Sequence, residues 1–165
     1  LLTLSRIESG QSVGKRIRLN LTSILRECFQ RFGAVAEGKR IDLRLDLESD
    51  RLDVLGDTEA LLQIFDNLIS NAVKYTQEGS WVAASVAAEY DGTRVTVADG
   101  GPGLPATQLE CLFEPYRRDD SHRDLPGKGL GLVVVHRLVE AMGGTIGVSQ
   151  PADAGLCFRL TLPTV

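Results

Sequence analysis

The sequence predicts an α+β fold, a two-layer sandwich in which about three helices pack over a mixed, largely antiparallel five-stranded sheet. Two observations carry this prediction. Segments with the helical period are interspersed with short segments in which apolar and polar residues alternate, and several of the latter are joined as hairpins. The 165 residues, 43% hydrophobic and 24% charged, are enough for one domain with an ordinary core.

The first half of the chain predicts two long helices and one strand. Residues 21–37 carry apolar side chains at helical spacing. Residues 41–48 alternate Ile or Leu with charged residues, which is typical of a half-buried strand. Asp57 can cap a second helix that extends to about residue 76. Residues 11–18 are polar, and we expect a linker there.

The second half predicts four strands, one long helix and one short helix. The Asp91-Gly92 pair is a strong hairpin signal between the first two of these strands. In chain order, the predicted elements are strands 81–90 and 94–98, a short helix 108–113, a polar mobile loop 117–126, a helix 130–142, and strands 145–149 and 157–162.

Three polar residues share one face of the predicted helix 57–76. Asn67, Asn71 and Lys74 lie within about 60° of one another at 100° per residue, opposite the apolar face. An amide oxygen is a suitable hard ligand for Mg²⁺, and an ammonium group is a point charge for phosphate. Two Asn residues inside a helix lower its stability, which suggests a use for them. A solvated polar face remains the alternative interpretation.

A glycine-rich turn, Asp99-Gly100-Gly101-Pro102-Gly103, follows the predicted strand 94–98. Gly101 and Gly103 allow the backbone to approach a ligand closely. The Asp99 carboxylate can accept a hydrogen bond from the exocyclic amine of adenine, whereas guanine presents a carbonyl oxygen there. A plain turn is the alternative, because Asp and Gly are common turn residues.

A second glycine cluster, Gly127-Lys128-Gly129-Leu130-Gly131, opens the predicted helix 130–142. The free N–H groups at a helix N-terminus suit a phosphate. The spacing fits neither a Walker A loop nor a Rossmann fingerprint, so the motif is weak in isolation. Six of the 17 glycines lie between residues 100 and 131, which concentrates exposed backbone in this part of the chain.

Taken together and in this order, the motifs are specific. The chain resembles the ATP-binding catalytic domain of sensor histidine kinases, a branch of the Bergerat-type (GHKL) superfamily with type II topoisomerases, a heat-shock chaperone and mismatch-repair ATPases. Four boxes match in register, and the resemblance covers essentially the whole chain. They are the N box at 67–76, the G1 box at 99–103, the F box at 113–116 and the G2 box at 127–132.

The resemblance implies a role for each matched position. Asn71 would bind Mg²⁺, Asn67 and Lys74 would contact the phosphates as catalytic residues, Tyr75 would pack near the adenine, and Asp99 would bind its amine. The residues implied in nucleotide binding are Asn67, Asn71, Lys74, Tyr75, Asp99, Gly101, Gly103, Gly127, Lys128, Gly129, Leu130 and Gly131. Residues 117–126 would be a lid that orders over ATP. Lys128 stands where Thr or Ser is common beside these glycines, and whether it touches the γ-phosphate is an open question.

One position separates the branches of this superfamily. The ATPase relatives carry a Glu four residues before the metal-binding Asn, as base for the attacking water, but Asn67 occupies this position here. An amide cannot take a proton at neutral pH, so we expect phosphoryl transfer to a protein with little hydrolysis. A degenerate nucleotide-responsive interaction domain is an alternative, and an anti-sigma-type serine kinase is another.

The acceptor of the phosphoryl group is expected outside this sequence. His122 lies in the predicted lid and His136 in the last helix, and neither fits the acceptor position of the family. Residues 1–11 resemble the end of the dimerisation and histidine-phosphotransfer helix, and 12–165 would be the catalytic domain. The first residue is Leu, so we expect a piece of a longer protein.

The resemblance implies ATP and Mg²⁺ as cofactors and three partners: an upstream phosphoacceptor domain, a response-regulator receiver domain, and a second copy of the full-length protein. The net charge of −4 argues against nucleic acid as a partner. Three widely spaced cysteines fit a reducing compartment, and no apolar stretch is long enough to span a membrane. We therefore expect a cytoplasmic domain, with a membrane anchor elsewhere in the full-length protein as one option.

Overall fold

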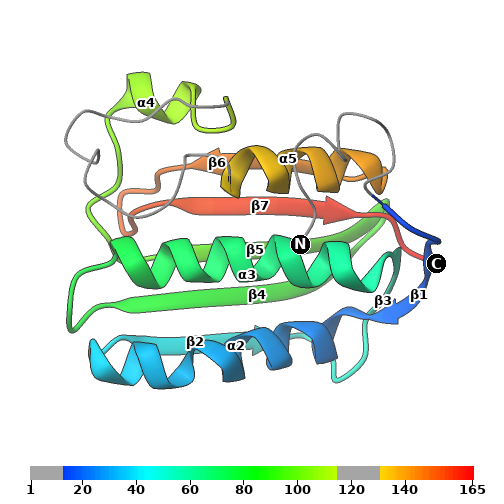
Figure 1. Ribbon diagram of the computed structural model, residues 1–165, viewed down its shortest axis with the longest axis horizontal. Coiled ribbons are helices and arrows are strands. Elements are labelled where there is room, and N and C mark those ends of the chain that lie inside the picture. The colour runs from blue at the N-terminus through cyan, green and yellow to red at the C-terminus, as the bar shows by residue number, and fades with distance from the viewer. Residues whose placement is uncertain (1–12, 115–130) are drawn as a thin grey trace.

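The structure is a computed structural model that describes residues 13–114 and 131–165 (Figure 1). Within these residues the chain forms helices and strands in the order β1 (Ile17–Asn20), α2 (Leu21–Gly38), β2 (Asp42–Leu47), β3 (Asp53–Gly56), α3 (Thr58–Tyr75), β4 (Trp81–Glu89), β5 (Gly92–Asp99), α4 (Ala106–Glu110), α5 (Gly131–Ala141), β6 (Thr145–Ser149) and β7 (Cys157–Leu162).

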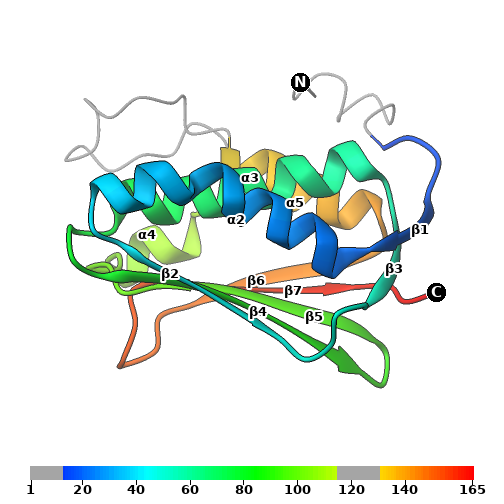
Figure 2. The same ribbon diagram turned by 90° about the horizontal axis from the view of Figure 1, so that it is seen from below.

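The main sheet has five strands in the order β2-β4-β5-β7-β6. The β2–β4 pair is parallel, whereas the other three pairs are antiparallel. Helices α2, α3 and α5 lie side by side over one face of this sheet, and the opposite face carries no helix among the described residues (Figures 1 and 2). The predicted α+β sandwich with a mixed five-stranded sheet is therefore confirmed.

The core lies between the helices and the sheet. Helix α3 presents one continuous apolar stripe, and Leu61, Phe65 and Leu68 on it are at most 1% exposed. Alternate residues of the central strands, such as Val86 and Val97, are buried against this stripe. The polar face of α3, which carries the residues of interest, is therefore directed away from the sheet.

The buried contact between α2 and α3 also includes a thiol. Cys28 of α2 is fully buried, and Arg31 forms an ion pair with Asp66 of α3 at 2.7 Å. Burial, followed by the nearby Asp66 carboxylate, raises the pKa of the Cys28 thiol to about 12. Because the thiolate is the reactive form, Cys28 is inert and serves packing.

The predicted linker at residues 11–18 is wrong in its last two residues. Ile17 and Arg18 begin β1, which pairs antiparallel with β3 as a separate two-stranded sheet. The count of five strands is therefore too low by these two. Each is only four residues long, too short to show a period, and their pairing joins segments more than 30 residues apart. Arg18 pairs with Asp53 across this small sheet, and Arg51 pairs with the same carboxylate from two residues earlier in the chain.

Other element boundaries shift slightly. The short helix expected at 108–113 lies at Ala106–Glu110 and is followed by a turn. The strand expected at 94–98 extends to Gly92–Asp99, so Asp99 is its last residue. No helix among the described residues is long and apolar enough to cross a membrane.

Candidate nucleotide site

The Asp99 side chain is held in a fixed orientation at the end of the central strand β5. Its Oδ1 accepts hydrogen bonds from the backbone N–H groups of Gly101 at 2.9 Å and Leu156 at 3.3 Å. Its own N–H and C=O bond to the segment before β7, through Leu156 O and Gly155 N. The residue is only 9% exposed, so a buried carboxylate is fixed by backbone donors on both sides.

Burial raises the pKa of the Asp99 carboxyl above its usual value, and the two backbone hydrogen bonds counteract part of this effect. A desolvated carboxylate is costly unless it is paired. Since the hydrogen bonds from Gly101 N and Leu156 N both end on Oδ1, Oδ2 is the oxygen left for a further donor. An exocyclic amine is a donor of the right type for this position.

The glycines that follow Asp99 are required by their surroundings. A Cβ on Gly101 would lie 2.9 Å from Asp99 Oδ1 and 3.4 Å from the hydroxyl of Thr76, which is 2% exposed. Gly103 has a φ of +73°, and a Cβ there would lie 2.5 Å from Gln150 Oε1. That oxygen accepts a hydrogen bond from Leu104 N at 2.7 Å, which fixes the loop. The turn is therefore closely packed against Asp99 and Thr76.

The predicted polar face of α3 is present. Asn67 and Asn71 are partly exposed, on the opposite side of α3 from its apolar stripe. The N-terminus of α5 approaches the same face, since a Cβ on Gly131 would lie 3.5 Å from Asn67 Oδ1. The structure thus brings Asn67 of the N box and Gly131 of the G2 box together.

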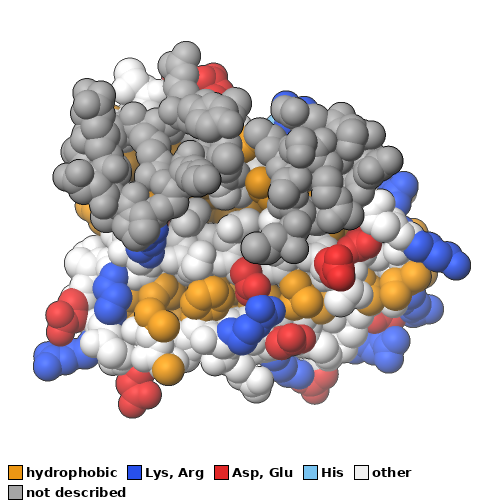
Figure 3. All heavy atoms as spheres, viewed as in Figure 1, with side chains coloured by type: hydrophobic (Ala, Val, Ile, Leu, Met, Phe, Trp, Pro, Cys, Tyr) orange, Lys and Arg blue, Asp and Glu red, His pale blue; other side chains and the backbone are white. Residues whose placement is uncertain are grey.

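Lys74 and Tyr75 end this helix, and both are exposed. The Lys74 ammonium lies 5.4 Å from the centroid of the Tyr75 ring. Lys74 also borders a hollow of about 320 Å³ between α2 and α3, where apolar side chains are visible along the helix surface (Figure 3). The hollow is lined by Phe32, Val35, Lys39, Ser70, Val73 and Lys74. Lys74 therefore lies between the amide face of α3 and the α2 side.

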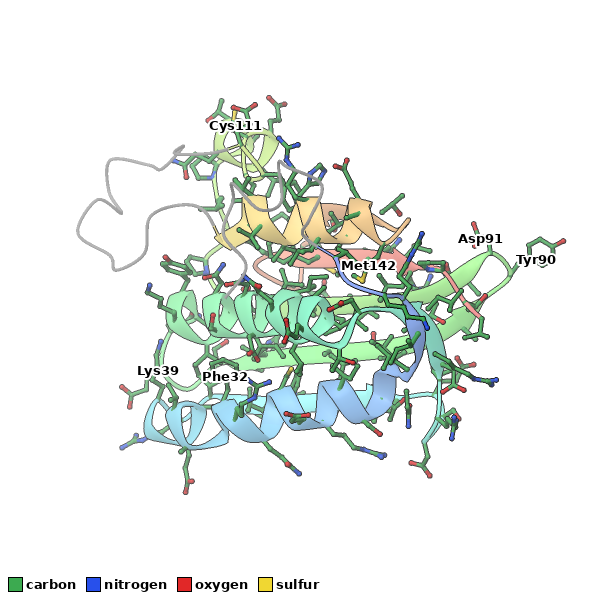
Figure 4. The ribbon with its side chains drawn as sticks, turned by 45° about the vertical axis from the view of Figure 1, so that its right-hand side comes forward. Phe32, Lys39, Tyr90, Asp91, Cys111 and Met142 are labelled. Atoms are coloured by element: carbon green, nitrogen blue, oxygen red, sulfur yellow. The ribbon has the colours of Figure 1, made fainter. Side chains whose placement is uncertain are left out.

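Lys39, just after α2, secures the end of α3. Its Nζ donates to the carbonyl oxygens of Val73, Lys74 and Thr76 at 2.7, 3.1 and 2.9 Å. Figure 4 places Lys39 at the same end of α2 as Phe32. A cation at the C-terminus of a helix satisfies its free carbonyl groups and interacts favourably with its dipole.

The same end of α3 is tied to the glycine turn. The side chains of Gln77 and Ser80 both donate to the carbonyl oxygen of Gly100 at 3.1 Å, and Gly100 N donates to Trp81 O. Through these bonds, the end of the helix that carries the amides is connected to the glycine turn that follows Asp99.

Several predicted residues lie outside the described part of the chain. They are Gly127, Lys128, Gly129, Leu130, the lid at 117–126, His122, and the helix end at residues 1–11. His136 is described. It lies in α5, with its ring stacked on Phe113 at 5.1 Å between centroids and its Nε2 3.6 Å from Glu140. This histidine packs α5 against Phe113.

Sequence reasoning missed the residues that hold Asp99 and the loops. Gly155 and Leu156 supply backbone groups to Asp99, Gln150 holds the Gly103 turn, and Lys39 caps α3. A Cβ on Gly155 would overlap Asp99 Oδ1. The only signal in the sequence is a glycine in a turn between two strands, which is common and does not indicate that Asp99, in a distant strand, is its partner.

The residues present fit a magnesium ion bound together with phosphates. No hydrogen bond between described residues occupies the Asn71 side-chain amide, so its oxygen is available as a hard ligand. The described residues contain no cluster of three or more His, Cys, Asp or Glu that could hold a metal.

Comparison with known proteins identifies the family and the fold of this chain. Residues 56–165 match the family described as histidine kinase-, DNA gyrase B-, and HSP90-like ATPase. The sensor protein GacS of Pseudomonas syringae is 36% identical over 98% of this chain, which spans 19% of the length of GacS.

Two solved structures share the fold. The catalytic domain of histidine kinase ThkA superposes with a TM-score of 0.83 at 24% identity, over 92% of this chain and 97% of that one. Full-length ShkA, solved in complex with AMPPNP, superposes with a TM-score of 0.82 at 30% identity, over 98% of this chain and 34% of ShkA.

Proposed function

Because the chain belongs to the family of histidine kinase-, DNA gyrase B-, and HSP90-like ATPases, we propose that it is the ATP-binding catalytic domain of a sensor histidine kinase. It transfers the γ-phosphoryl group of Mg-ATP to a histidine on an upstream dimerisation domain. The identity with GacS and ShkA supports this branch of the family.

The observation that carries the proposal is the pair Asn67 and Asn71 on one face of α3, with Asn67 against the start of α5. An ATPase needs a base for water, and an amide has no basic site at neutral pH. Phosphoryl transfer to a protein needs the donor held in position and its charge neutralised. At this position the chain offers groups that can hold the phosphates, and it lacks a base that could activate water.

Each end of the nucleotide has its own residues. Asp99 Oδ2 accepts a hydrogen bond from the adenine amine, and Gly101 and Gly103 let the backbone approach the base. Asn67 and Lys74 contact the phosphates and orient the γ-phosphoryl group for attack. Asn71 would provide the protein ligand of Mg²⁺, which when bound would supply charge neutralisation at the phosphate oxygens.

The phosphoacceptor comes from outside the described residues. His136 is packed on Phe113 inside α5, which leaves it unsuited to in-line attack on a nucleotide. We infer that residues 1–11 end the dimerisation helix and that 12–165 form the catalytic domain. The acceptor histidine, the receiver domain of a response regulator, a homodimeric assembly and a cytoplasmic location belong to this proposal for the whole protein.

The test mixes the chain with Mg-ATP labelled at the γ-phosphate and the upstream domain of the same protein. Acid-labile, base-stable label on that domain, with little free phosphate, is the expected result. An Asn67→Glu variant serves as a comparison, because it restores the position of a general base. Rapid phosphate release by the wild-type chain without transfer would contradict the proposal.

A further inference from the structure

The segment of residues 13–16, called here the leading segment, contacts the ends of two helices that are distant from it in the sequence. Gly14 N donates to Asp57 Oδ2 at 2.9 Å, and Arg16 Nη1 donates to Met142 O at 2.9 Å. Asp57 stands at the start of α3, and Met142 follows α5. One short segment therefore bridges both helices of the candidate nucleotide site.

The contact with α3 uses its capping residue. Asp57 Oδ1 accepts from Ala60 N at 2.9 Å and so caps the helix, while Oδ2 is occupied by Gly14 N. A Cβ on Gly14 would lie 2.6 Å from Asp57 Oδ2, so glycine is needed for this approach. The leading segment is thus seated directly on the N-terminus of α3.

The contact with α5 lies at its last carbonyl groups. Met142 is fully buried and is labelled at the end of this helix in Figure 4. The chain then turns through Gly143, whose φ is +82°, and Gly144 N bonds back to Val139 O. The Arg16 guanidinium places a positive charge at the C-terminus of α5, where the helix dipole favours it.

The opposite end of α5 reaches the nucleotide site. Its first residue, Gly131, lies against Asn67 of α3, and the two helices run side by side between the two locations (Figure 1). A helix is stiff along its axis, so a shift at Met142 moves Gly131 relative to Asn67. Arg16 therefore lies at one end of a rigid element whose other end forms part of the phosphate site.

We propose that Arg16 is a positioning residue for nucleotide binding, which it supports by holding α5 in register with α3. The inference rests on the proposed function of the site. It adds that movement of the leading segment at Arg16 changes the affinity for nucleotide. Since coupling between two sites is reciprocal, bound nucleotide in turn stabilises the docked leading segment.

The experiment measures the dissociation constant of Mg-ATP, well below the unfolding midpoint, for the wild type and three variants. Arg16→Ala is expected to weaken binding several-fold, on the order of 10-fold at most. Arg16→Lys keeps one donor and the charge, and it is expected to recover part of the loss. Arg18→Ala is the matched control, because Arg18 lies two residues along and, within residues 13–114 and 131–165, its ion pair is with Asp53 in the small sheet.

A second readout separates positioning from general stability. Saturating Mg-ATP should slow hydrogen exchange at the Gly14 amide in the wild type and have little effect in Arg16→Ala. Equal affinity of Arg16→Ala and wild type, or equal losses in Arg16→Ala and Arg18→Ala, would overturn the positioning role. A wild-type chain that binds no Mg-ATP would instead overturn the proposed function, and the positioning role with it.

Discussion

The two ends of the candidate nucleotide site are built in different ways. At the adenine end, Asp99 is 9% exposed and is held by backbone groups from the turn that follows it and from the segment before β7. At the phosphate end, Asn67 and Asn71 extend from a helix face, and no hydrogen bond between described residues occupies their side-chain amides. One end is a rigid part of the sheet, and the other is a set of side chains open to a ligand.

This difference separates recognition from chemistry. A preorganised carboxylate needs no rearrangement to bind a base, so it serves selection. Amide side chains such as those of Asn67 and Asn71, which make no hydrogen bond to another described residue, can bind phosphate oxygens and a metal ion as charge develops. Substitutions at the adenine end should therefore change affinity and folding stability together, whereas substitutions at the phosphate end should change nucleotide handling and catalysis without lowering folding stability.

The largest effect is expected from Asn71→Ala. Loss of the metal ligand should lower the rate of phosphoryl transfer by about 100-fold or more. Stability should stay the same or rise slightly, because Ala is a better helix former by up to ~0.7 kcal/mol. Transfer of labelled phosphate and urea unfolding measure the two quantities. Ser70→Ala, one residue away on the α2 side, is the control, and a matching loss there would break the comparison.

Asp99→Asn should affect both affinity and stability. The Asn oxygen would take the place of Oδ1 opposite Gly101 N and Leu156 N, which turns the amide NH₂ toward the adenine amine. Two donors then face each other, and we expect the affinity for Mg-ATP to fall about 10- to 100-fold. The free energy of unfolding should rise by on the order of 1 kcal/mol, because a desolvated charge is removed.

The control for this substitution is Asp91→Asn, at the exposed hairpin tip that joins β4 to β5 and far from the site (Figure 4). Calorimetric titration and urea unfolding of both variants provide the comparison. If Asp99→Asn bound Mg-ATP as tightly as wild type, or unfolded more easily than wild type, the account of the adenine end would be wrong.

Lys39→Met tests the contacts that secure the end of α3. The variant keeps the aliphatic stem but loses three hydrogen bonds to the last carbonyl groups of α3. We expect the free energy of unfolding to fall by about 1–3 kcal/mol. Lys15→Met removes an exposed lysine and should change little. Equal stability of the two variants would show that the Lys39 contacts contribute nothing.

The smallest effect concerns pH. Because the folded-state pKa of Asp99 lies above its usual value of 3.8, the native chain binds this proton more readily than the unfolded chain. The cost of the buried charge is present above the folded pKa and disappears as pH falls toward 3.8. The stability advantage of Asp99→Asn should therefore shrink on acidification. Unfolding free energies across this range measure it, and a constant difference would contradict the assignment.

The parts that could be predicted from the sequence are those with local signals. The polar stripe of Asn67, Asn71 and Lys74 follows from the helical period over eight residues, and Asp99 follows from its place between a strand and a glycine turn. The sandwich follows from the order of periodic segments, and the structure confirms it.

The remainder depends on contacts between distant segments. Leu156 meets Asp99 across 57 residues, and Arg16 meets Met142 across 126, with no local pattern that marks either pair. Strands β1 and β3 have four residues each, which is too few to show an alternation of apolar and polar residues. They are stabilised by pairing with each other. Tertiary pairing decides such features after the local preferences have been satisfied.

The most direct test of the central claim compares Mg-ATP with Mg-GTP by calorimetric titration of the wild-type chain. The carboxylate of Asp99 accepts from the adenine amine, whereas the guanine carbonyl would face it as a second acceptor. The account predicts that Mg-ATP binds tighter by at least about 10-fold, the usual scale for a mismatched buried polar group. Equal affinity for the two nucleotides would contradict it.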